Sequence, residues 1–346
     1  MDRRSFLLSS FAVGAAGALG ACATGPTTGS DPAPQRAGSA EPGAFPVTIE
    51  HAFGTTTITR EPRRVVCLGT SDADSLLALG VVPVGATKIG WGGNADGSTP
   101  WFDAALEAVG GRTPTRVDDS DSIPFDDVAA LAPDLVLVTN YALTRSDYGR
   151  LAKVADVVAY PGDAWTTTWQ QSLEMVGKAV GRPAAAAQVR RETDGVLARV
   201  RARHPELAGR SFVWAAISAT DLSSIPFYTP QDARPRLLTE VGMVNAPVVE
   251  RLAEAGQFYG TVSAERAADL RSDLLITYAE DEAAARTLIE DPLIRQIPAV
   301  AAGHVLAAID QVDALSGTTP SPLAIPWAAR HWFPHVAAAL GTVVVS

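Results

Sequence analysis

The sequence predicts an α/β protein made of two similar α/β lobes joined by a single long helix, with a cleft between the lobes. Three observations support this: short apolar runs alternate with helix-like segments, two stretches of the chain repeat one another, and one long helical segment separates the two sets. With 346 residues, 47% of them hydrophobic and 19% charged, the chain is long enough for two domains and can bury a sizeable core.

The N-terminal lobe is expected over residues 47–165. Short apolar runs predict strands of a largely parallel sheet, at Val65–Leu68, Val82–Ala86, Leu135–Val138 and Val157–Tyr160. Helices are expected between them at Ser75–Leu79 and Asp126–Leu131. Cys67 lies within the first apolar run, which predicts a buried core thiol rather than a nucleophile.

The connecting segment is expected over residues 166–207, with a helix at 183–204. Pro183 suits the first turn of a helix and Pro205 ends it. Val189, Val196 and Val200 share one face, with Leu197 beside them. A single stiff helix between two lobes implies a clamshell with little hinge motion.

The C-terminal lobe is expected over residues 208–346, with strands at Ser211–Ile217, Leu274–Thr277 and Val305–Ile309. Part of it repeats the first lobe at a constant offset. Asp126, Leu131 and Asp134 precede one apolar strand, and Glu265, Leu270 and Asp273 precede another with the same spacing. This predicts two lobes of similar architecture; chance similarity between two ordinary αβ units is the alternative.

The first 21 residues have the pattern of an export signal. Arg3 and Arg4 form a twin-arginine pair, and an apolar stretch too short and too rich in Gly and Ser to span a bilayer follows. The segment Leu19–Cys22 is similar to a bacterial lipobox, which implies cleavage before Cys22 and lipid on that residue. The arginine pair resembles a twin-arginine (Tat) signal, although the general secretory (Sec) route remains open.

Residues 22–46 are expected to form the lipidated cysteine and a flexible tether. Gly, Pro, Ser, Thr and Ala dominate this stretch, and Phe45 is its one large apolar side chain after residue 24. The chain as a whole is acidic, with a formal net charge of −10 and no basic run. Nucleic acids and acidic membrane surfaces are therefore poor candidates for partners.

The lipobox, the tether, the strand expected at Val65–Leu68, the segment Ala130–Leu137 and the connecting helix occur in this order along the chain. In this the chain resembles a substrate-binding lipoprotein of an ABC importer of the iron-siderophore and cobalamin class. The resemblance spans about residues 47–340, and its most specific parts are the lipobox and the segment Ala130–Leu137. It implies an exported protein held by lipid at the outer face of the cell membrane. It also implies capture of a ferric siderophore, with the iron inside the chelate and no cofactor or metal site of the protein's own, and delivery to permease and ATPase subunits. A monomer is expected, with no nucleic-acid partner.

No catalytic signature accompanies the resemblance, so the chain is not expected to be an enzyme. Nucleophile-elbow, phosphate-loop and dinucleotide-binding motifs do not occur in the sequence. His331 and His335 lack a partner carboxylate between them, and the acidic run Asp118–Asp121 is typical of a solvated loop. A cobalamin or haem carrier of the same fold, a secreted enzyme and a surface sensory module remain as alternatives.

Large rings and one arginine are the candidate ligand-binding residues, because rings offer contact area and a guanidinium offers a fork of donors to oxygen. Most follow expected strands, where open α/β sheets bind ligands. The set is Trp91, Trp101, Tyr141, Arg145, Trp165, Trp214, Tyr228 and Tyr259, with Arg234, Arg236 and Arg330 as further candidates for the anion contact.

The resemblance also implies two permease-docking carboxylates, one in each lobe. The matching positions are Asp126 and Glu265, which are equivalent in the internal repeat. The alternative is that each carboxylate only complements a helix dipole, which contributes ~0.3–1 kcal/mol. Asp126 is one methylene shorter than the usual Glu, and Asp127 beside it could act in its place.

Overall fold

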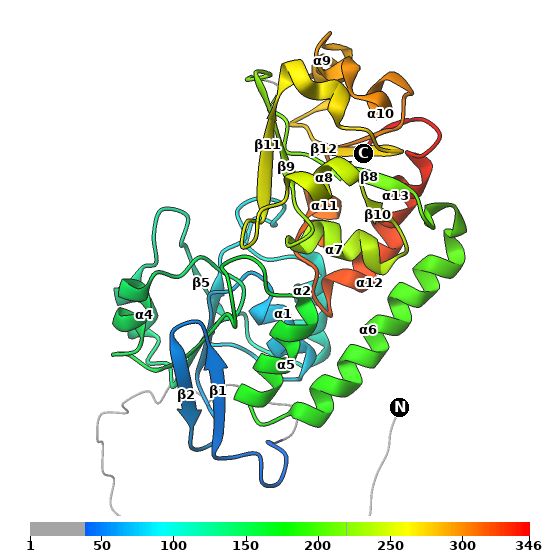
Figure 1. Ribbon diagram of the computed structural model, residues 1–346. Helices are drawn as coiled ribbons and strands as arrows, with labels where there is room; N and C mark the ends of the chain where they lie inside the picture. Colours follow the sequence, from blue (N-terminus) through cyan, green and yellow to red (C-terminus); the bar gives the residue numbers. More distant parts are fainter. Residues whose placement is uncertain (1–38, 219) are drawn as a thin grey trace, which may run out of the picture. The chain divides into compact units, whose positions relative to one another are not determined.

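The computed structural model describes residues 39–218 and 220–346, and within them the chain forms two α/β lobes (Figure 1). The expected signal peptide, Cys22 and most of the tether lie outside the described residues. In the described part of the chain, none of the helices has the length and apolar character needed to cross a membrane.

The N-terminal lobe contains a five-stranded, wholly parallel sheet in the order β5-β4-β3-β6-β7. Its strands are β3 (Val65–Cys67), β4 (Gly85–Thr87), β5 (Thr115–Val117), β6 (Leu135–Val138) and β7 (Asp156–Ala159). The expected strand at Val82–Ala86 begins later, because Pro83 has no N–H to donate to a neighbouring strand. An antiparallel hairpin of β1 (Val47–His51) and β2 (Gly54–Ile58) precedes this sheet.

Four helices connect the strands of this sheet, α1 (Asp72–Ala78), α2 (Pro100–Ala108), α3 (Phe125–Ala130) and α4 (Arg145–Leu151), and α5 (Trp169–Ala179) follows the last strand. Several begin at a threonine that caps the first turn, as expected for hydroxyls at this position. The Thr168 hydroxyl accepts from the backbone N–H of Gln171, whose side chain reaches back to the cap, so α5 starts with a complete capping box.

The C-terminal lobe repeats this plan with a five-stranded parallel sheet in the order β10-β8-β12-β13-β14. Its strands are β8 (Ser211–Trp214), β10 (Val244–Asn245), β12 (Leu274–Tyr278), β13 (Val305–Ala308) and β14 (Val343–Val345). An antiparallel pair, β9 (Ser224–Tyr228) and β11 (Tyr259–Ser263), was not anticipated from the sequence. Tyr259, one of the candidate ligand-binding residues, therefore lies within a strand.

The helices of this lobe are α7 (Ala233–Glu240), α8 (Pro247–Leu252), α9 (Glu282–Glu290), α10 (Pro298–Ala301), α11 (Gln311–Thr318), α12 (Ala324–His331) and α13 (Phe333–Ala338). Short 3₁₀ helices occur at η1 (Pro205–Leu207), η2 (Ala264–Asp269) and η3 (Ile294–Gln296). The helix expected at Glu265 is thus a 3₁₀ helix of six residues.

The internal repeat has a structural counterpart at the start of the first strand of each lobe. Asp134, just before β6, accepts hydrogen bonds from the backbone N–H groups of Arg63 and Arg64 at 2.6 and 2.8 Å. Asp273, just before β12, accepts from the backbone N–H of Ser211 at 2.7 Å. In both lobes, therefore, the repeated aspartate joins the chain entering one strand to the neighbouring strand.

The long helix α6 (Pro183–Arg203) connects the lobes and contacts α5 on one side and α12 on the other. Ala186, Leu197 and Val200 on its inner face are buried. They belong to one continuous apolar core that includes β3, β6, α5, β8 and β12. A core shared in this way couples the two lobes through packing as well as through the helix.

Residues just before the first strand are packed against the lobe rather than free. The Glu41 carboxylate accepts from the backbone N–H groups of Ala184 and Ala185 at 2.9 and 3.1 Å, and so satisfies donors in the first turn of α6. Phe45 packs against the same shared core. Contacts with the lobe thus extend back to Glu41, ahead of the tether boundary at residue 46 expected from composition.

Candidate functional site

The carboxyl ends of the strands in the two lobes meet one another. The loop after β4 carries Trp91, whose ring lies edge-on to that of Tyr278 at the end of β12, with centroids 5.4 Å apart. The next residue, Gly92, donates its N–H to the side-chain oxygen of Gln311 at the start of α11, at 3.3 Å. Ligands of open α/β sheets bind at carboxyl ends of strands, so this edge is the candidate site.

Carboxylates dominate the segments that run from the carboxyl end of each parallel strand to the next helix. Across the described chain these segments contain a single cationic side chain, Lys88. The carboxylates they contain are Asp96, Asp118, Asp119, Asp121, Asp163, Asp221, Asp232, Glu280, Asp281 and Asp310. Lys88 itself is paired with Asp118 at 2.7 Å.

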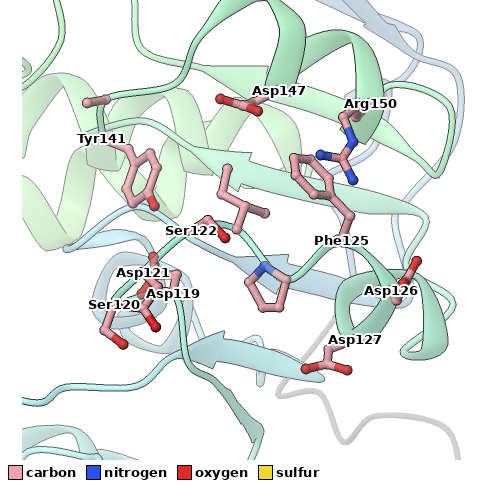
Figure 2. A pocket seen from close by; sticks show the side chains of 13 residues that line it. Asp119, Ser120, Asp121, Ser122, Phe125, Asp126, Asp127, Tyr141, Asp147 and Arg150 are labelled. Carbon is pink, nitrogen blue, oxygen red and sulfur yellow. The ribbon is translucent and has the colours of Figure 1, made fainter.

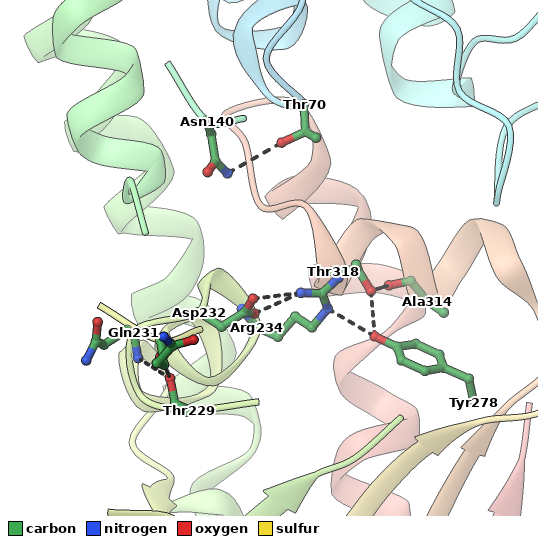
Figure 3. A network of polar contacts seen from close by, with 10 residues as sticks. Thr70, Asn140, Thr229, Gln231, Asp232, Arg234, Tyr278, Ala314 and Thr318 are labelled. Atoms are coloured by element: carbon green, nitrogen blue, oxygen red, sulfur yellow. Dashed lines mark hydrogen bonds and ion pairs between the residues drawn. The ribbon is translucent and has the colours of Figure 1, made fainter. Parts of the chain in front are cut away.

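Arg234, in the first turn of α7, is the most enclosed cation of the candidate site. Its Nη1 lies 2.8 Å from Oδ2 of Asp232, and its Nε donates to the Tyr278 hydroxyl at 3.3 Å. The guanidinium carbon lies 4.0 Å from the centre of the Tyr228 ring, in cation–π geometry. Figure 3 shows the guanidinium between Asp232 and Tyr278.

This network has a local origin in the sequence Thr229–Arg234. The Asp232 side chain caps α7 by accepting the backbone N–H of Arg234 at 2.8 Å, so the same carboxylate that starts the helix also binds the guanidinium. The Tyr278 hydroxyl is in turn 3.0 Å from the Thr318 hydroxyl on α11. Three segments distant in sequence therefore fix the position of one arginine.

Burial and charge both act on the ionisable groups of this network. Burial alone would lower the pKa of Arg234, but Asp232 and the neighbouring tyrosines raise it overall, so the guanidinium stays protonated. Burial raises the pKa of Tyr228 to about 12 against the opposing effect of Arg234, so its hydroxyl remains a donor at neutral pH. Nη2 of Arg234 has no hydrogen-bond partner within the described part of the chain, which leaves it available for an oxygen ligand.

An aromatic pair marks the same edge of the N-terminal lobe. Tyr141 follows β6 and Trp165 follows β7, and their ring centroids are 5.5 Å apart. Trp165 has a backbone φ of 63°, in the left-handed region that large side chains rarely adopt. Such strain is found most often at ligand-binding positions, where the surroundings impose it. Nearby, the Asn140 side-chain amide donates to the Thr70 hydroxyl at 3.4 Å (Figure 3).

A cavity of about 770 Å³ opens beside Tyr141 within the N-terminal lobe (Figure 2). Asp119 and Asp121 lie on the same side of it as Tyr141, and Phe125 lies opposite with the Arg150 guanidinium 3.5 Å above its ring. Burial, and secondarily the negative charge of Asp119, raise the pKa of Tyr141 to about 12. A second cavity, between the lobes near Trp101 and Leu315, measures only about 30 Å³.

Two predicted site residues are buried in packing contacts. Trp214 is 0% exposed and stacks on Trp332, because β8 is a central strand covered on both faces. Trp101 is 7% exposed, and its indole N–H donates to Asp74 at 2.9 Å from the first turn of α2 rather than from a loop. Both rings are therefore packing residues in this structure.

The other predicted residues divide between the site and its surroundings. Trp91, Tyr141, Trp165 and Tyr228 belong to the contacts described above, whereas Tyr259 is 50% exposed on β11 with its ring against Phe258. Arg145 is exposed on α4, with its guanidinium over the ring of Phe53 in the β1–β2 hairpin, and forms no contact with the other members of the set.

Of the three further arginines, Arg234 is the one that joins the aromatic residues. The Arg236 guanidinium instead donates to backbone carbonyls, including that of Thr166 in the other lobe, and Arg330 lies beside α6. Asp232 and Thr318 were not identified from the sequence as site residues, and Tyr278, although it ends an expected strand, was not included in the predicted set. A signal for the first was present, because an aspartate placed directly before a helix with an arginine two residues later predicts a cap and an ion pair.

Both predicted docking carboxylates are exposed. Asp126 lies in the first turn of α3 and Glu265 in η2. No group of three or more His, Cys, Asp or Glu side chains suited to hold a metal ion occurs within residues 39–218 and 220–346. Cys67 is buried, and burial is the main cause that raises the pKa of its thiol.

Solved structures with the same fold include several binding proteins. PiaA of Streptococcus pneumoniae TIGR4, solved in complex with ferrichrome, is 30% identical to this chain with a TM-score of 0.80, covering 85% of this chain and 98% of that one. A periplasmic solute binding protein from Mycobacterium smegmatis is 28% identical with a TM-score of 0.71, covering 85% and 99%.

Binding proteins are also found among the relatives that are similar to this chain in sequence. The ferric enterobactin-binding periplasmic protein FepB of Escherichia coli is 26% identical over 76% of this chain and 84% of its own length. The probable siderophore-binding lipoprotein YfiY of Bacillus subtilis is 29% identical over 39% of this chain, and the match spans only 38% of YfiY. Residues 65–311 match the family described as periplasmic binding protein, and because this stretch is well over half of the chain, the protein belongs to that family.

Proposed function

We propose that this protein captures a ferric siderophore outside the cytoplasm and delivers it to an ABC importer. The observation that carries the proposal is Arg234, whose guanidinium is fixed by Asp232 and flanked by Tyr228 and Tyr278. A ferric siderophore presents oxygen atoms around a wrapped metal and a partly apolar shell. A fixed fork of donors surrounded by rings suits both features.

The site on this proposal comprises the Arg234 network in the C-terminal lobe and the Tyr141–Trp165 pair in the N-terminal lobe, with Trp91 beside Tyr278. The protein would need no metal ligands of its own, because the chelate already satisfies the iron. Its role is binding and release rather than catalysis, so binding should be stoichiometric, with the chelate recovered unchanged.

Export and anchoring complete the proposal. Cleavage before Cys22 and lipid on that residue would hold the protein at the outer face of the cell membrane, and Arg3 and Arg4 would direct it through the twin-arginine route. Cys22→Ala should then release the protein from the membrane fraction. Replacing Arg3 and Arg4 together by Lys should block export, and unchanged export would assign the protein to the Sec route.

The direct test is a titration of the purified protein with a panel of ferric siderophores, haem and cobalamin, followed by tryptophan fluorescence and thermal unfolding. A cognate chelate at about 100 times its dissociation constant stabilises a protein by ~2.7 kcal/mol, which is readily seen as a higher melting temperature. The iron-free siderophore should shift the melt much less. Binding of haem or cobalamin alone would replace the siderophore proposal by a carrier of those ligands.

A further inference from the structure

The charges of the candidate site indicate which net charge a bound ferric chelate should have. Ferric iron bound by three hydroxamates forms a neutral complex, because each hydroxamate contributes one negative charge. Ferric iron bound by three catecholates forms a trianion, because each catecholate contributes two. A site for the trianion therefore needs excess positive charge, whereas a site for the neutral complex needs oriented donors without net charge.

The two best-placed cations are already neutralised. Arg234 is paired with Asp232 at 2.8 Å, and the Asp232 side chain is only 4% exposed, so the pair stays together in a poorly solvated position. Lys88, at the carboxyl end of β4, is paired with Asp118 at 2.7 Å. Neither pair offers a net positive charge to a bound anion.

Carboxylates without a cationic partner lie beside the aromatic pair. Asp119 and Asp121 line the same cavity as Tyr141, and Asp163 is two residues before Trp165. None of the three forms an ion pair with any residue that the structure describes. Asp163 also lies close to the other lobe: a Cβ added to Gly256 would be 3.2 Å from its carboxylate oxygen. A multiply charged anion placed beside the aromatic pair would meet these like charges, whereas Arg150, the cation that lines the same cavity, lies across it with its guanidinium over the Phe125 ring.

The same site is well equipped for a neutral chelate. Nη2 of Arg234 can donate to hydroxamate oxygens, which carry partial negative charge, and the rings of Tyr228, Tyr141 and Trp165 can cover the apolar shell of the chelate. The unpaired carboxylates would even favour an ammonium group on the ligand.

We infer that the cargo is an uncharged or cationic ferric chelate of the tris-hydroxamate type, an inference that rests on the proposed function. Trianionic tris-catecholate chelates are rejected by charge. The polyanionic ferric complexes of citrate are rejected for the same reason. The discriminating residues on this reading are Asp232, which neutralises Arg234, and the carboxylates Asp119, Asp121 and Asp163.

The test compares four probes by fluorescence titration of the purified protein: ferrichrome, which is neutral, ferrioxamine B, which carries an ammonium group, ferric enterobactin, which is trianionic, and ferric citrate, which is polyanionic. We expect one or both hydroxamate chelates to bind at least about a hundredfold more tightly than ferric enterobactin. Raising the ionic strength from about 0.05 M to about 0.5 M should leave ferrichrome affinity unchanged and strengthen the weak binding of the trianion, because salt screens the repulsion.

Variants that remove a carboxylate charge from the site test whether charge or the shape of the chelate sets the selectivity. Asp232→Asn keeps an acceptor for the helix cap but frees the charge of Arg234, and should raise the affinity for ferric enterobactin about tenfold without an equal gain for ferrichrome. Should this variant unfold, Asp119→Asn with Asp121→Asn tests the same point from the other lobe. Asp291→Asn is the matched control, because Asp291 also caps a helical turn but lies beyond the far end of α9.

The outcomes are distinct. Equal or tighter binding of ferric enterobactin by the unchanged protein, or of ferric citrate, would overturn this inference and leave the proposed function intact. Failure of every ferric chelate to bind a folded protein would instead overturn the proposed function. Charge variants that leave the selectivity unaltered would assign any observed preference to shape and overturn the charge argument.

Discussion

The carboxylate of Asp74 on α1 accepts hydrogen bonds from the indole N–H of Trp101 in its own lobe and from the hydroxyl of Ser321 in the other lobe. Desolvation at this contact raises the pKa of Asp74 from 3.8 to about 6, against the opposing effects of these two hydrogen bonds and of Arg116. Burial thus favours the neutral form of Asp74. Because Asp74 bridges the two lobes, the contact between the lobes depends on pH.

The first prediction concerns the pH dependence of stability. The pKa of Asp74 is higher in the folded protein than in the unfolded chain. The contribution of Asp74 to the free energy of unfolding is therefore most favourable below about pH 4 and is lost as the pH rises through about 6. Asp74→Asn keeps an acceptor for both donors and should raise the free energy of unfolding near pH 7 by up to about 3 kcal/mol. Urea unfolding between about pH 4 and pH 8 measures this, with exposed Asp281→Asn as control.

A stability gain in Asp74→Asn that does not depend on pH would contradict this account, as would a loss at neutral pH. The latter would mean that the ionised carboxylate, through Arg116, stabilises the contact more than burial destabilises it.

The second prediction concerns Arg234. Arg234→Lys keeps a positive charge beside Asp232 but loses the planar fork, and should weaken binding of the cognate chelate by about 10- to 100-fold while the protein stays folded. Arg266→Lys is the matched control, since Arg266 forms an exposed pair with Asp269 at 2.9 Å in the same lobe. Unchanged affinity in Arg234→Lys would remove the arginine from the site and return Arg145 to consideration.

The third prediction uses the strained backbone at Trp165. Trp165→Gly relieves a left-handed conformation, a gain of about 1–2 kcal/mol, and loses the ring contact with Tyr141, a cost of about 0.5–1.5 kcal/mol. The melting temperature should therefore change little, while affinity for the chelate falls more than tenfold. A large loss of stability with unaltered affinity would identify Trp165 as a packing residue instead.

Much of the fold could be predicted because it follows from local patterns. The apolar run at Leu135–Val138 is a strand, and the run expected at Ser211–Ile217 forms a strand over Ser211–Trp214. Pro183 and Pro205 bound the connecting helix, because apolar runs and proline act on their immediate neighbours. The antiparallel pair β9 and β11 was missed, since its strands are far apart in sequence and β9 contains Pro226.

The candidate site could be predicted only in part, for a different reason. Strand ends can be located from sequence, which is why Tyr141 and Trp165 were selected. Burial cannot be read in the same way: Trp214 and Tyr228 both lie in strands, yet Trp214 is covered on both faces while Tyr228 lies under Arg234. The pairing of Arg234 with Tyr278 depends on two elements 44 residues apart, which no local pattern reveals.

The fourth prediction tests the internal repeat. Asp134→Ala removes the acceptor for two backbone N–H groups before β3, and Asp273→Ala removes the acceptor for the backbone N–H and the hydroxyl of Ser211 at the start of β8. Each change should lower the free energy of unfolding by about 1–3 kcal/mol, because each leaves two donors without their acceptor. Denaturant unfolding measures both, and substitutions that leave stability unchanged would mean that water satisfies these donors equally well.

The last prediction concerns delivery to the importer and separates binding from transport. Asp126 and Glu265 are exposed, occupy equivalent positions in the two lobes and have no ion-pair partner among the described residues. Glu265 lies in the first turn of a 3₁₀ helix of six residues and Asp126 in the first turn of an α-helix of six, so both dipoles are small and helix stabilisation accounts for little of their placement. Asp126→Ala with Glu265→Ala should therefore leave chelate affinity and melting temperature unchanged, while iron uptake by cells falls severalfold because two charge contacts with the permease are lost.

Asp127→Ala with Asp269→Ala is the matched control, since these neighbours are also exposed. Undiminished uptake in the first double variant would reduce both carboxylates to ordinary surface residues, and reduced uptake in the control alone would move the docking contact by one side chain in the N-terminal lobe.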